Sequence, residues 1–407
     1  MKIIKLGMLC DVVSSKRIFE EEYTDKGVPF IRGQEVSDAT IDDENFNDFE
    51  CYISESRYEQ IVEQYGSPNK GDILITAVGT IGNVLQLSAQ RKFYFKDGNI
   101  LWLKNFSREV DSSYLYYYLQ SPFFKKILNY SLIGAVQKAL TISKLSQLEV
   151  ILPDLLVQKR IGSFFSNIDK KIQNNKRQIE TLGSIAKTIY DYWFVQFDFP
   201  NEEGKPYKSS GGKMVLNEEL KREIPEGWNE TSIGKITNCL DSKRIPLSGK
   251  QRELKKGNIP YYGATSIMGF VDEFIFDGDF VLMAEDGSIM TSQNTPILQR
   301  ISGKSWVNNH AHVIEPKGKY SCSIIFQFLK NVYVPSLKTG SIQAKITQNK
   351  MNSIKVVNIP DAFLEKYNET IEPIDKIIKL SNEEISILNK VKESLLPLIM
   401  SGQVSLK

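Results

Sequence analysis

The feature that most constrains the fold of this 407-residue chain is that its two halves repeat each other. Five positions of the first half match positions 206 residues later: Gly134, Gln137 and Thr141 recur as Gly340, Gln343 and Thr347, and the apolar Leu145 and Leu148 correspond to Met351 and Ile354. Upstream, Ser15-Lys16-Arg17-Ile18 recurs as Ser242-Lys243-Arg244-Ile245, and Gly71-Asp72 matches Gly278-Asp279. Because the matches keep the same order, the sequence predicts two copies of one domain, the first carrying about twenty extra residues.

After each repeat comes a long run of apolar residues whose spacing alternates between four and three, as in a coiled coil. The first run consists of Ile161, Phe165, Ile168, Ile172, Asn175, Ile179, Leu182, Ala186, Ile189 and Trp193. The second consists of Leu364, Tyr367, Ile371, Ile374, Ile378, Ser381, Ile385 and Leu388, then shifts phase to Val391, Leu395 and Leu398. An ordinary core helix is the alternative, but it averages only about 11 to 12 residues. The runs therefore predict a pair of long helices.

Each run contains a single polar residue, Asn175 in the first and Ser381 in the second. Such a residue can fix the register of paired helices at some cost in stability. A solvent-facing position near a bend of the helix explains it equally well. The sequence leaves both interpretations open.

The chain divides into five predicted segments. A first domain covers residues 1–153, a long helix 154–198, a linker rich in Pro, Gly and Ser 199–223, a second domain 224–358 and a second long helix 359–407. Hairpins are predicted within Lys70–Leu87 and Asp277–Met290, the second turning at Glu285-Asp286-Gly287, and a helix is predicted over Tyr114–Tyr130. Further strands are expected at 28–32, 93–95, 100–104, 306–308 and 311–315. Each domain is thus expected to be mixed α+β.

Composition is that of a folded protein, with 41% apolar and 25% charged residues. The opening residues Met1–Cys10 are too short and too charged for a secretion signal, and no run of 18 apolar residues occurs, so a cytoplasmic location is expected. Residues 1–153 hold 17 basic and 20 acidic residues, a net charge of −3, whereas 224–358 hold 16 and 11, a net charge of +5. By charge alone, only the second domain resembles a DNA-binding surface.

Neither a metal site nor a catalytic centre is expected. The four cysteines lie far apart without a CxxC pair, which is typical of reduced thiols. His310 and His312, the only histidines, could share one face of a strand but have no third ligand nearby in the sequence. The sequence also lacks the GxSxG, HExxH, GxxxxGK[ST] and post-strand GxGxxG patterns and the tetrapeptide that holds a flipped adenine in amino-methyltransferases.

Four strings of residues resemble type I restriction-modification specificity subunits, and the resemblance extends over essentially the whole chain. They are Trp193–Val215 (WFVQFDFPNEEGKPYKSSGGKMV), Ile224–Trp228 (IPEGW), the GxxQxx[LI]T pattern at Gly134–Thr141 and Gly340–Thr347, and Leu395–Val404 (LLPLIMSGQV). One departure from equivalence between the halves is the hairpin of the second, which reads AEDG rather than VGTIGN.

The resemblance implies two target-recognition domains separated by two long antiparallel helices in a coiled coil, with approximate two-fold symmetry. The first helical run would span about 48 Å, against about 34 Å for one turn of B-DNA. Each domain would read one half of a split, asymmetric site in double-stranded DNA. Two methyltransferase subunits would dock on the helices and methylate adenine, using S-adenosylmethionine that this chain does not bind, and a motor-nuclease subunit would join for restriction.

Side chains that could contact DNA are predicted from residue type. The candidates for contacts with bases and phosphates are Gln137, Lys138, Gln343 and Lys345. The candidates for phosphates alone are Lys16, Arg17, Arg91, Lys92, Lys243, Arg244, Lys250, Arg252, Lys255 and Lys256. An ordinary solvated surface is the alternative at each position. Among the candidates for DNA contact, the run from Lys250 to Lys256 is preferred.

Two other functions stay open at this point. A stand-alone enzyme such as a nuclease would turn over substrate in isolation, and a coiled-coil scaffold would bind only proteins. The duplicated domains with unlike loops favour DNA recognition over both.

Overall fold

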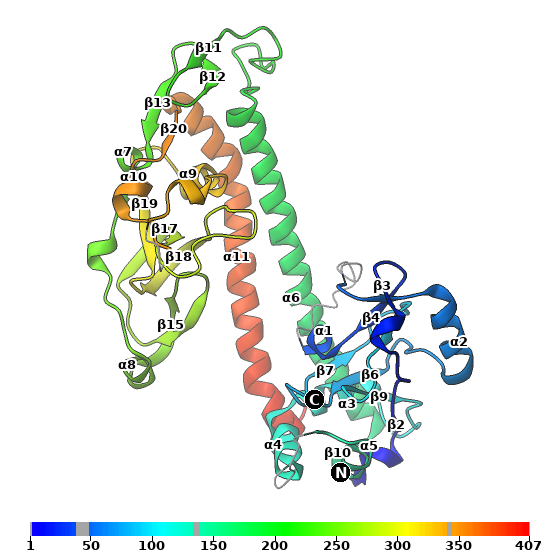
Figure 1. The fold of residues 1–407 in the computed structure, drawn as a ribbon. Coiled ribbons are helices and arrows are strands. Elements are labelled where there is room, and N and C mark those ends of the chain that lie inside the picture. Colours follow the sequence, from blue (N-terminus) through cyan, green and yellow to red (C-terminus); the bar gives the residue numbers. More distant parts are fainter. Residues whose placement is uncertain (1, 38–48, 133–138, 340–343, 407) are drawn as a thin grey trace. The chain divides into compact units, whose positions relative to one another are not determined.

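The computed structural model describes residues 2–37, 49–132, 139–339 and 344–406 (Figure 1). It divides into two compact units, the first formed by residues 1–174 and 384–407 and the second by residues 175–383. The division cuts both long helices, so each unit contains one predicted domain together with part of each helix. The unit boundaries therefore lie inside the helices rather than at the five segment boundaries expected from the sequence.

The first unit is built around two small sheets. One has the strand order β2-β9-β6-β7 and the other β3-β5-β4-β8. The strands are β2 (Asp11–Ser14), β3 (Tyr23–Thr24), β4 (Val28–Ile31), β5 (Tyr52–Ile53), β6 (Ile73–Thr76), β7 (Val84–Gln86), β8 (Tyr94–Phe95) and β9 (Ile100–Lys104). Strands β1 (Lys2–Lys5) and β10 (Glu149–Leu152) pair antiparallel and bring the two ends of the domain together. This confirms the predicted hairpin at 70–87 and the predicted mixed α+β architecture.

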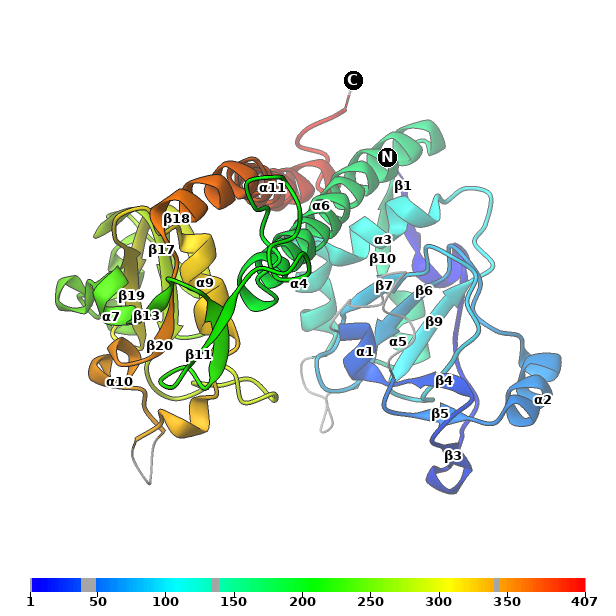
Figure 2. The same ribbon diagram turned by 90° about the horizontal axis from the view of Figure 1, so that it is seen from above.

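The helices of the first domain are short, and Figure 2 shows α3 beside β7. They are α1 (Gly33–Ser37), α2 (Glu55–Tyr65), α3 (Ser112–Gln120), α4 (Pro122–Ser131), α5 (Ile142–Gln147) and the 3-10 turns η1 (Leu6–Met8) and η2 (Glu20–Glu22). The helical stretch predicted over 114–130 is confirmed, and it is divided into α3 and α4 at Ser121. The Ser121 hydroxyl caps α4 and Pro122 occupies its first turn, where a missing N–H costs nothing.

The second unit contains a six-stranded sheet in the order β14-β19-β17-β18-β15-β16. Its strands are β14 (Thr237–Cys239), β15 (Lys256–Tyr262), β16 (Ile267–Val271), β17 (Phe276–Ala284), β18 (Leu298–Val307) and β19 (Ala311–Pro316). Strands β13 (Asn229–Ser232) and β20 (Lys355–Asn358) pair antiparallel, as β1 and β10 do in the first domain. The helical elements are α7 (Ile233–Ile236), η4 (Asp241–Lys243), α8 (Gly249–Leu254), α9 (Cys322–Lys330), η5 (Val334–Ser336) and α10 (Gln348–Asn352).

The hairpin predicted at 277–290 is wrong in its register. Strand β17 pairs with β18, so the connection runs over residues 285–297 instead of turning tightly at Glu285-Asp286-Gly287. Similarly, Gly71-Asp72 and Gly278-Asp279 are not structural equivalents, since Asp72 is buried and Asp279 is exposed. In strands a shift of one residue moves a side chain to the opposite face, which explains how a sequence match can miss the register.

The two heptad runs form two long helices, α6 (Leu155–Tyr190) and α11 (Asp361–Met400), and α6 continues into a π-helical turn, η3 (Asp191–Val195). All the predicted seam residues up to Leu395 are buried or partly buried. Leu398 was wrongly placed in the seam and is 37% exposed, whereas Leu396 and Ile399 are buried. The three-four spacing thus identified the buried face correctly until the last turn.

Within the first unit, α6 and α11 run antiparallel. An oxygen of Asp169 lies 2.6 Å from Lys392 Nζ, and Lys171 Nζ lies 3.2 Å from an oxygen of Glu384. A residue later in α6 therefore contacts a residue earlier in α11, as antiparallel helices require. Four seam residues of α6 share one core cluster with three residues of α11. They are Ile161, Phe165, Ile168 and Ile172, with Leu396, Ile399 and Met400.

Within the second unit the two helical segments also contact each other. The rings of Trp193 in η3 and Tyr367 in α11 meet edge-on, with their centroids 5.9 Å apart. The two polar seam residues, Asn175 and Ser381, are both buried, and Ser381 Oγ bonds to Gln178 Oε1 at 3.3 Å. Their burial rules out the solvent-facing alternative. Buried polar groups with partners at these positions favour a role in helix register.

The predicted linker 199–223 is a folded part of the second unit. Its strand β11 (Met214–Asn217) forms a hairpin with β12 (Arg222–Pro225), which begins inside the segment and ends two residues beyond it. Phe199 is buried, and its ring stacks on the rings of Trp228 and Tyr207, with centroid separations of 5.2 and 4.8 Å. The ring centroid of Phe363 lies 4.5 Å from that of Phe199. Its Gly and Ser content suggested flexibility, but its aromatic residues supply enough buried area to order it.

The repeat seen in the sequence is reproduced in local structure. Thr141 caps α5 by accepting the N–H of Lys144, and Thr347 caps α10 by accepting the N–H of Lys350. A Cβ added to Gly7 would lie 2.9 Å from Ser146, and one added to Gly234 would lie 2.8 Å from Asn352. The matching residues therefore serve the same N-cap and close-packing roles in both domains.

Among the described residues, no helix is both long and apolar enough to cross a membrane. The four cysteines are free thiols.

Candidate nucleic-acid interface

Two predicted phosphate contacts of the first domain, Lys16 and Arg17, follow strand β2 and are exposed. Lys16 Nζ lies 4.4 Å above the ring of Tyr65. Arg17 Nε donates to Asp97 at 3.2 Å while its side chain stays 68% exposed. Because exposed ion pairs of this kind contribute little energy, both cations can exchange their partners for an anionic ligand.

Arg91 and Lys92 lie on the connection between β7 and β8. Arg91 is partly buried, and Lys92 is exposed. Lys92 forms an ion pair with Glu55 in the first turn of α2 and lies 5.3 Å from the ring of Tyr58. The hydrogen bond to Glu55 raises the pKa of Lys92, so this lysine stays positively charged.

The turn between β6 and β7 anchors the segment that carries the repeated GxxQ motif. The amide of Leu140 donates to the carbonyl of Ala77 at 2.9 Å, and the amide of Ala77 donates to Asn99 at 2.7 Å. Gln137 and Lys138 lie outside the described residues, as does Gln343 in the second domain. The predictions for these three residues stay predictions.

The preferred basic run of the second domain begins on α8, which Ser248 and Gln251 cap in a capping box. Lys250 and Lys256 are exposed, and so is Lys243 on η4. In the part of the chain that the structure describes, these three lysines make no ion pair. They are therefore accessible to a polyanion.

The other two members of the run are occupied within the domain. Arg252 donates to the carbonyl of Met268 at 2.9 Å and lies 5.2 Å from the ring of Tyr261. Lys255 pairs with Glu273 at 2.5 Å. The four residues that the sequence grouped together thus divide into two exposed cations and two with partners inside the domain.

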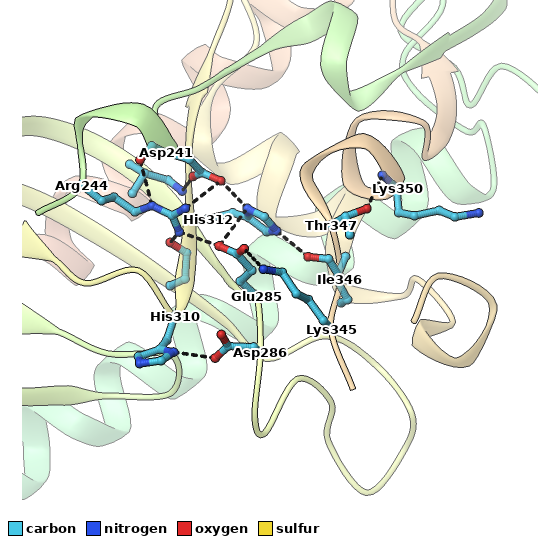
Figure 3. A network of polar contacts seen from close by, with 12 residues as sticks. Asp241, Arg244, Glu285, Asp286, His310, His312, Lys345, Ile346, Thr347 and Lys350 are labelled. Carbon is cyan, nitrogen blue, oxygen red and sulfur yellow. Dashed lines mark hydrogen bonds and ion pairs between the residues drawn. The ribbon is translucent and has the colours of Figure 1, made fainter. Parts of the chain in front are cut away.

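Arg244 differs sharply from its sequence counterpart Arg17. Its side chain is only 11% exposed and lies within a polar network (Figure 3). The guanidinium contacts Glu285 at 2.7 Å, Asp241 at 3.3 Å and the carbonyl of Ala311 at 2.6 Å. The structure therefore corrects the assumption that this guanidinium is free to contact phosphate, because all these acceptors lie inside the domain.

The two histidines have separate environments. His310 is exposed and pairs with Asp286 at 2.6 Å, whereas His312 is fully buried on β19. The sequence offered no third ligand near the two histidines. In the fold, Cys239 and Asp241 supply polar groups next to His312, and the ligand atoms of these three residues all lie within 4.8 Å of one another.

This cluster does not have the chemistry of a metal site. Burial raises the pKa of the Cys239 thiol to about 12, so the thiol is a neutral group within this network. Both ring nitrogens of His312 are already engaged, by Asp241 at 2.5 Å and by the carbonyl of Ile346 at 2.8 Å. The positive charge of Arg244 beside Asp241 further opposes a second cation.

Glu285 connects this network to the surface. One of its carboxylate oxygens pairs with Arg244, and the other pairs with Lys345 Nζ at 2.8 Å. The Lys345 side chain is 46% exposed, and its hydrogen bond to Glu285 raises its pKa. Lys345 is therefore a charged group at the surface whose position a buried carboxylate determines.

The first domain has the same backbone arrangement without these charges. The amide of Ile346 donates to the carbonyl of Glu285 at 2.9 Å, just as the amide of Leu140 donates to Ala77. Ala77 therefore occupies the position of Glu285. The sequence signal was the difference between the VGTIGN and AEDG hairpins, but it did not indicate that the glutamate is buried.

The strand pairing extends the correspondence. Strand β2 pairs Val12 with Leu103 and, two residues on, Ser14 with Leu101. Strand β14 pairs Cys239 with Ile314. Two residues further along, Asp241 lies opposite His312 and is hydrogen-bonded to it, as Ser14 lies opposite Leu101 in the first domain. Asp241, Glu285 and His312 thus replace Ser14, Ala77 and Leu101. From the sequence, His312 was considered only as a metal ligand, and Asp241 and Glu285 were not expected to be functional.

These carboxylates give the second unit a specific response to acid. Burial alone would raise the pKa of Asp241 and of Glu285, but hydrogen bonds and nearby positive charge lower both. A lowered folded-state pKa stabilises the fold above the unfolded value of about 4, and this stabilisation is lost as the pH falls through the folded value. We expect the free energy of unfolding of the second unit to fall below about pH 4.

Hydrogen exchange of second-unit amides as a function of pH measures this effect. A chain with Asp241→Asn and Glu285→Gln lacks both carboxylates and should lose less stability over the same acid range. An unchanged acid response in that double variant would contradict the assignment.

Comparison with known proteins gives one family. The model described as type I restriction modification DNA specificity domain matches residues 1–183 and 225–392. The type I restriction enzyme MjaIX specificity subunit of Methanocaldococcus jannaschii is 27% identical over 364 residues, covering 82% of this chain and 78% of the relative. The putative type I restriction enzyme MjaX specificity subunit of the same organism is 24% identical over 394 residues, covering 94% and 88%.

Among solved structures, the type I restriction-modification S subunit from M. genitalium aligns with a TM-score of 0.59 and 19% identity. The alignment covers 97% of this chain and 95% of that chain. At this identity the likeness shows that the fold is shared.

Proposed function

The chain belongs to the family of type I restriction-modification DNA specificity domains, and we propose that it binds a split, asymmetric site in double-stranded DNA. It is a non-catalytic recognition subunit, and its two domains each read one half-site. The half-sites differ because the two domains differ in net charge and in the side chains at structurally equivalent positions.

The observation that carries this proposal is that the family match covers both halves of the chain. The halves share the Thr141 and Thr347 helix caps and the closing strand pairs β1–β10 and β13–β20. A duplicated scaffold with different side chains suits the reading of two unlike sequences. The long helices α6 and α11 supply a spacer that leaves the intervening base pairs unread.

The partners follow from the family. Two methyltransferase subunits dock on the helices and methylate the N6 atom of an adenine in each half-site. They supply the S-adenosylmethionine site, and this chain binds no cofactor. Motor-nuclease subunits join the complex for restriction, and the complex acts in the cytoplasm.

Mapping N6-methyladenine in the host genome tests the proposal. We expect methylation at one split motif, its loss when the gene is deleted, and its return on complementation. Methylation that persists unchanged after deletion would refute the proposed role. Recovery of the motif also identifies both half-sites.

A matched pair of complementing chains tests the exposed lysines. Lys250→Ala with Lys256→Ala removes two phosphate contacts, so we expect the fraction of methylated sites to fall at every copy of the motif without a change in its sequence. Lys330→Ala, at the exposed end of α9, is the control and should leave methylation unchanged. Equal behaviour of the two chains would exclude Lys250 and Lys256 from the interface.

A further inference from the structure

Helix α11 carries a three-residue string that also occurs in α6. Ile168-Asp169-Lys170 recurs as Ile374-Asp375-Lys376, at the same offset of 206 residues that relates the two domains. The aspartate of each string contacts the domain that precedes its helix. Tyr117 Oη donates to Asp169 at 2.8 Å, and Arg300 pairs with Asp375. The repeat thus places an equivalent carboxylate between helix and domain in both halves.

The contact of Asp375 is a bidentate ion pair with Arg300 of strand β18. Arg300 Nη1 lies 2.8 Å from Asp375 Oδ1, and Nη2 lies 2.7 Å from Oδ2. A planar guanidinium that bonds both oxygens of a carboxylate fixes the direction between the two groups as well as the distance. Figure 2 shows β18 beside α11 in the second unit, so this pair restricts how the sheet is turned against the helix.

The pair lies beyond the apolar contact between the second domain and α11. Leu364, Tyr367 and Ile371 of α11 belong to the same buried core cluster as Ile325 and Leu329 of α9. The hydrophobic effect attaches the domain to the helix at this place. Because it is non-directional, it determines the angle between sheet and helix less strictly than a directed pair does.

Farther along α11, a cavity of about 690 Å³ lies between the helix and the sheet. Arg300 and Asp375 both line it and connect its two walls. Lys379, one helical turn beyond Asp375, lies 3.6 Å from Asp279 of β17 and adds a second, longer pair. Ion pairs therefore replace apolar packing in this part of the contact between domain and helix.

The first domain has a different side chain at the position of Arg300. Aligning Ala77 with Glu285 also aligns Ile73 of β6 with Val281 of β17. The partners of these last two residues on the next strand are Gln86 and Arg300. Gln86 is uncharged, and its Nε2 donates to Ser112 Oγ at 3.1 Å inside its own domain. The cation that reaches from the sheet to a long helix is therefore a feature of the second domain.

We propose that Arg300 and Asp375 are positioning residues that set the angle of the second recognition domain on α11, and thereby the number of unread base pairs accepted between the half-sites. The proposal rests on the proposed recognition of a split site. One added base pair moves a half-site by about 3.4 Å along the duplex and turns it by about 35° around the axis. A domain held at a fixed angle does not follow this rotation, whereas a domain that pivots on its apolar contact does.

Methylation by the complex of the full-length chain with its methyltransferase subunits tests this proposal. The substrates are duplexes that carry both native half-sites with a spacer of native length, one base pair shorter or one base pair longer. We expect Arg300→Ala and Asp375→Asn to raise the methylation rate at the altered spacers, relative to the native spacer, by roughly tenfold, the effect of one lost charged contact. The half-site sequences should stay the same. Variants that keep the spacer preference of the wild type would overturn the proposal.

An exchange of the two charges separates positioning from direct contact with DNA. Arg300→Glu alone and Asp375→Arg alone each bring like charges together, so each should relax the spacer preference. The chain with both changes has an ion pair between β18 and α11 again, and its spacer preference should return toward that of the wild type. If Arg300 contacted DNA itself, the exchange would not restore the preference, and that result would overturn the positioning role.

Glu365→Gln is the matched control. Glu365 of α11 pairs with Lys319 of the same domain, but it lies next to Leu364 in the apolar contact, which holds that end of the domain without it. Its loss should leave the spacer preference unchanged, and an equal relaxation in this variant would contradict a special role of Arg300 and Asp375. Partly exposed ion pairs contribute little to stability, so all these chains should fold. Absence of methylation by the wild-type complex at the native site would instead overturn the proposed function.

Discussion

Replacement of Arg244 by Ala is expected to lower the free energy of unfolding of the second unit by about 3–5 kcal/mol. The guanidinium is 11% exposed and bonds to two carboxylates and one carbonyl. Its removal leaves Asp241 and Glu285, whose side chains are both 11% exposed, beside each other without their shared cation. Most of the loss is the cost of uncompensated buried charge, rather than the net value of the ion pairs.

The chain supplies its own control for this experiment. Arg17 occupies the same place in the first copy of the Ser-Lys-Arg-Ile string, but it is 68% exposed and has one surface partner. Arg17→Ala should therefore cost at most about 1 kcal/mol. Urea denaturation with hydrogen exchange resolved by unit measures both variants. Similar losses for the two arginines would contradict the structural role of Arg244.

Joint replacement of Ile399 and Met400 by Ala is expected to destabilise the first unit by at least about 4 kcal/mol. Both side chains are at most 4% exposed and belong to the core cluster that includes Phe165 of α6. Truncation of a buried Ile or Met costs about 2–5 kcal/mol, because contacts are lost and a cavity remains. A change at the end of the chain should thus unfold its beginning.

Leu398→Ala is the matched control, since this neighbouring residue is 37% exposed. It should cost less than about 1 kcal/mol. Hydrogen exchange should show lost protection for the first-unit strands β2, β6 and β9 in the double variant, with protection of β17 and β19 retained. Loss confined to the last turns of α11, with the first-unit sheet unaffected, would refute the assignment.

The sequence by itself determined the features that depend on local spacing and repetition. Alternating steps of three and four identified the buried faces of α6 and α11, because the helical period places such residues on one side. The matched residues Thr141 and Thr347 fell at equivalent helix caps, because N-capping depends on a residue and its near neighbours. The resemblance added the family, which the comparisons confirmed.

Features that depend on the environment of a side chain were not accessible from the sequence. The Ser-Lys-Arg-Ile strings are identical, yet the Arg17 side chain is 68% exposed and the Arg244 side chain only 11%. The cause is that Asp241, Glu285 and His312 come from three separate segments and meet only in the folded domain. The ends of the long helices likewise complete cores formed by distant residues.

The same limit explains the wrong predictions. Composition marked 199–223 as a linker, but the stacking of Phe199 on Trp228 orders it. The tight turn at Glu285 was predicted from a glycine, but pairing of β17 with β18 moved the connection to 285–297. Local sequence sets the period and the cap of each element, whereas burial and charge pairing depend on residues far along the chain, and only tertiary structure decides which of them meet.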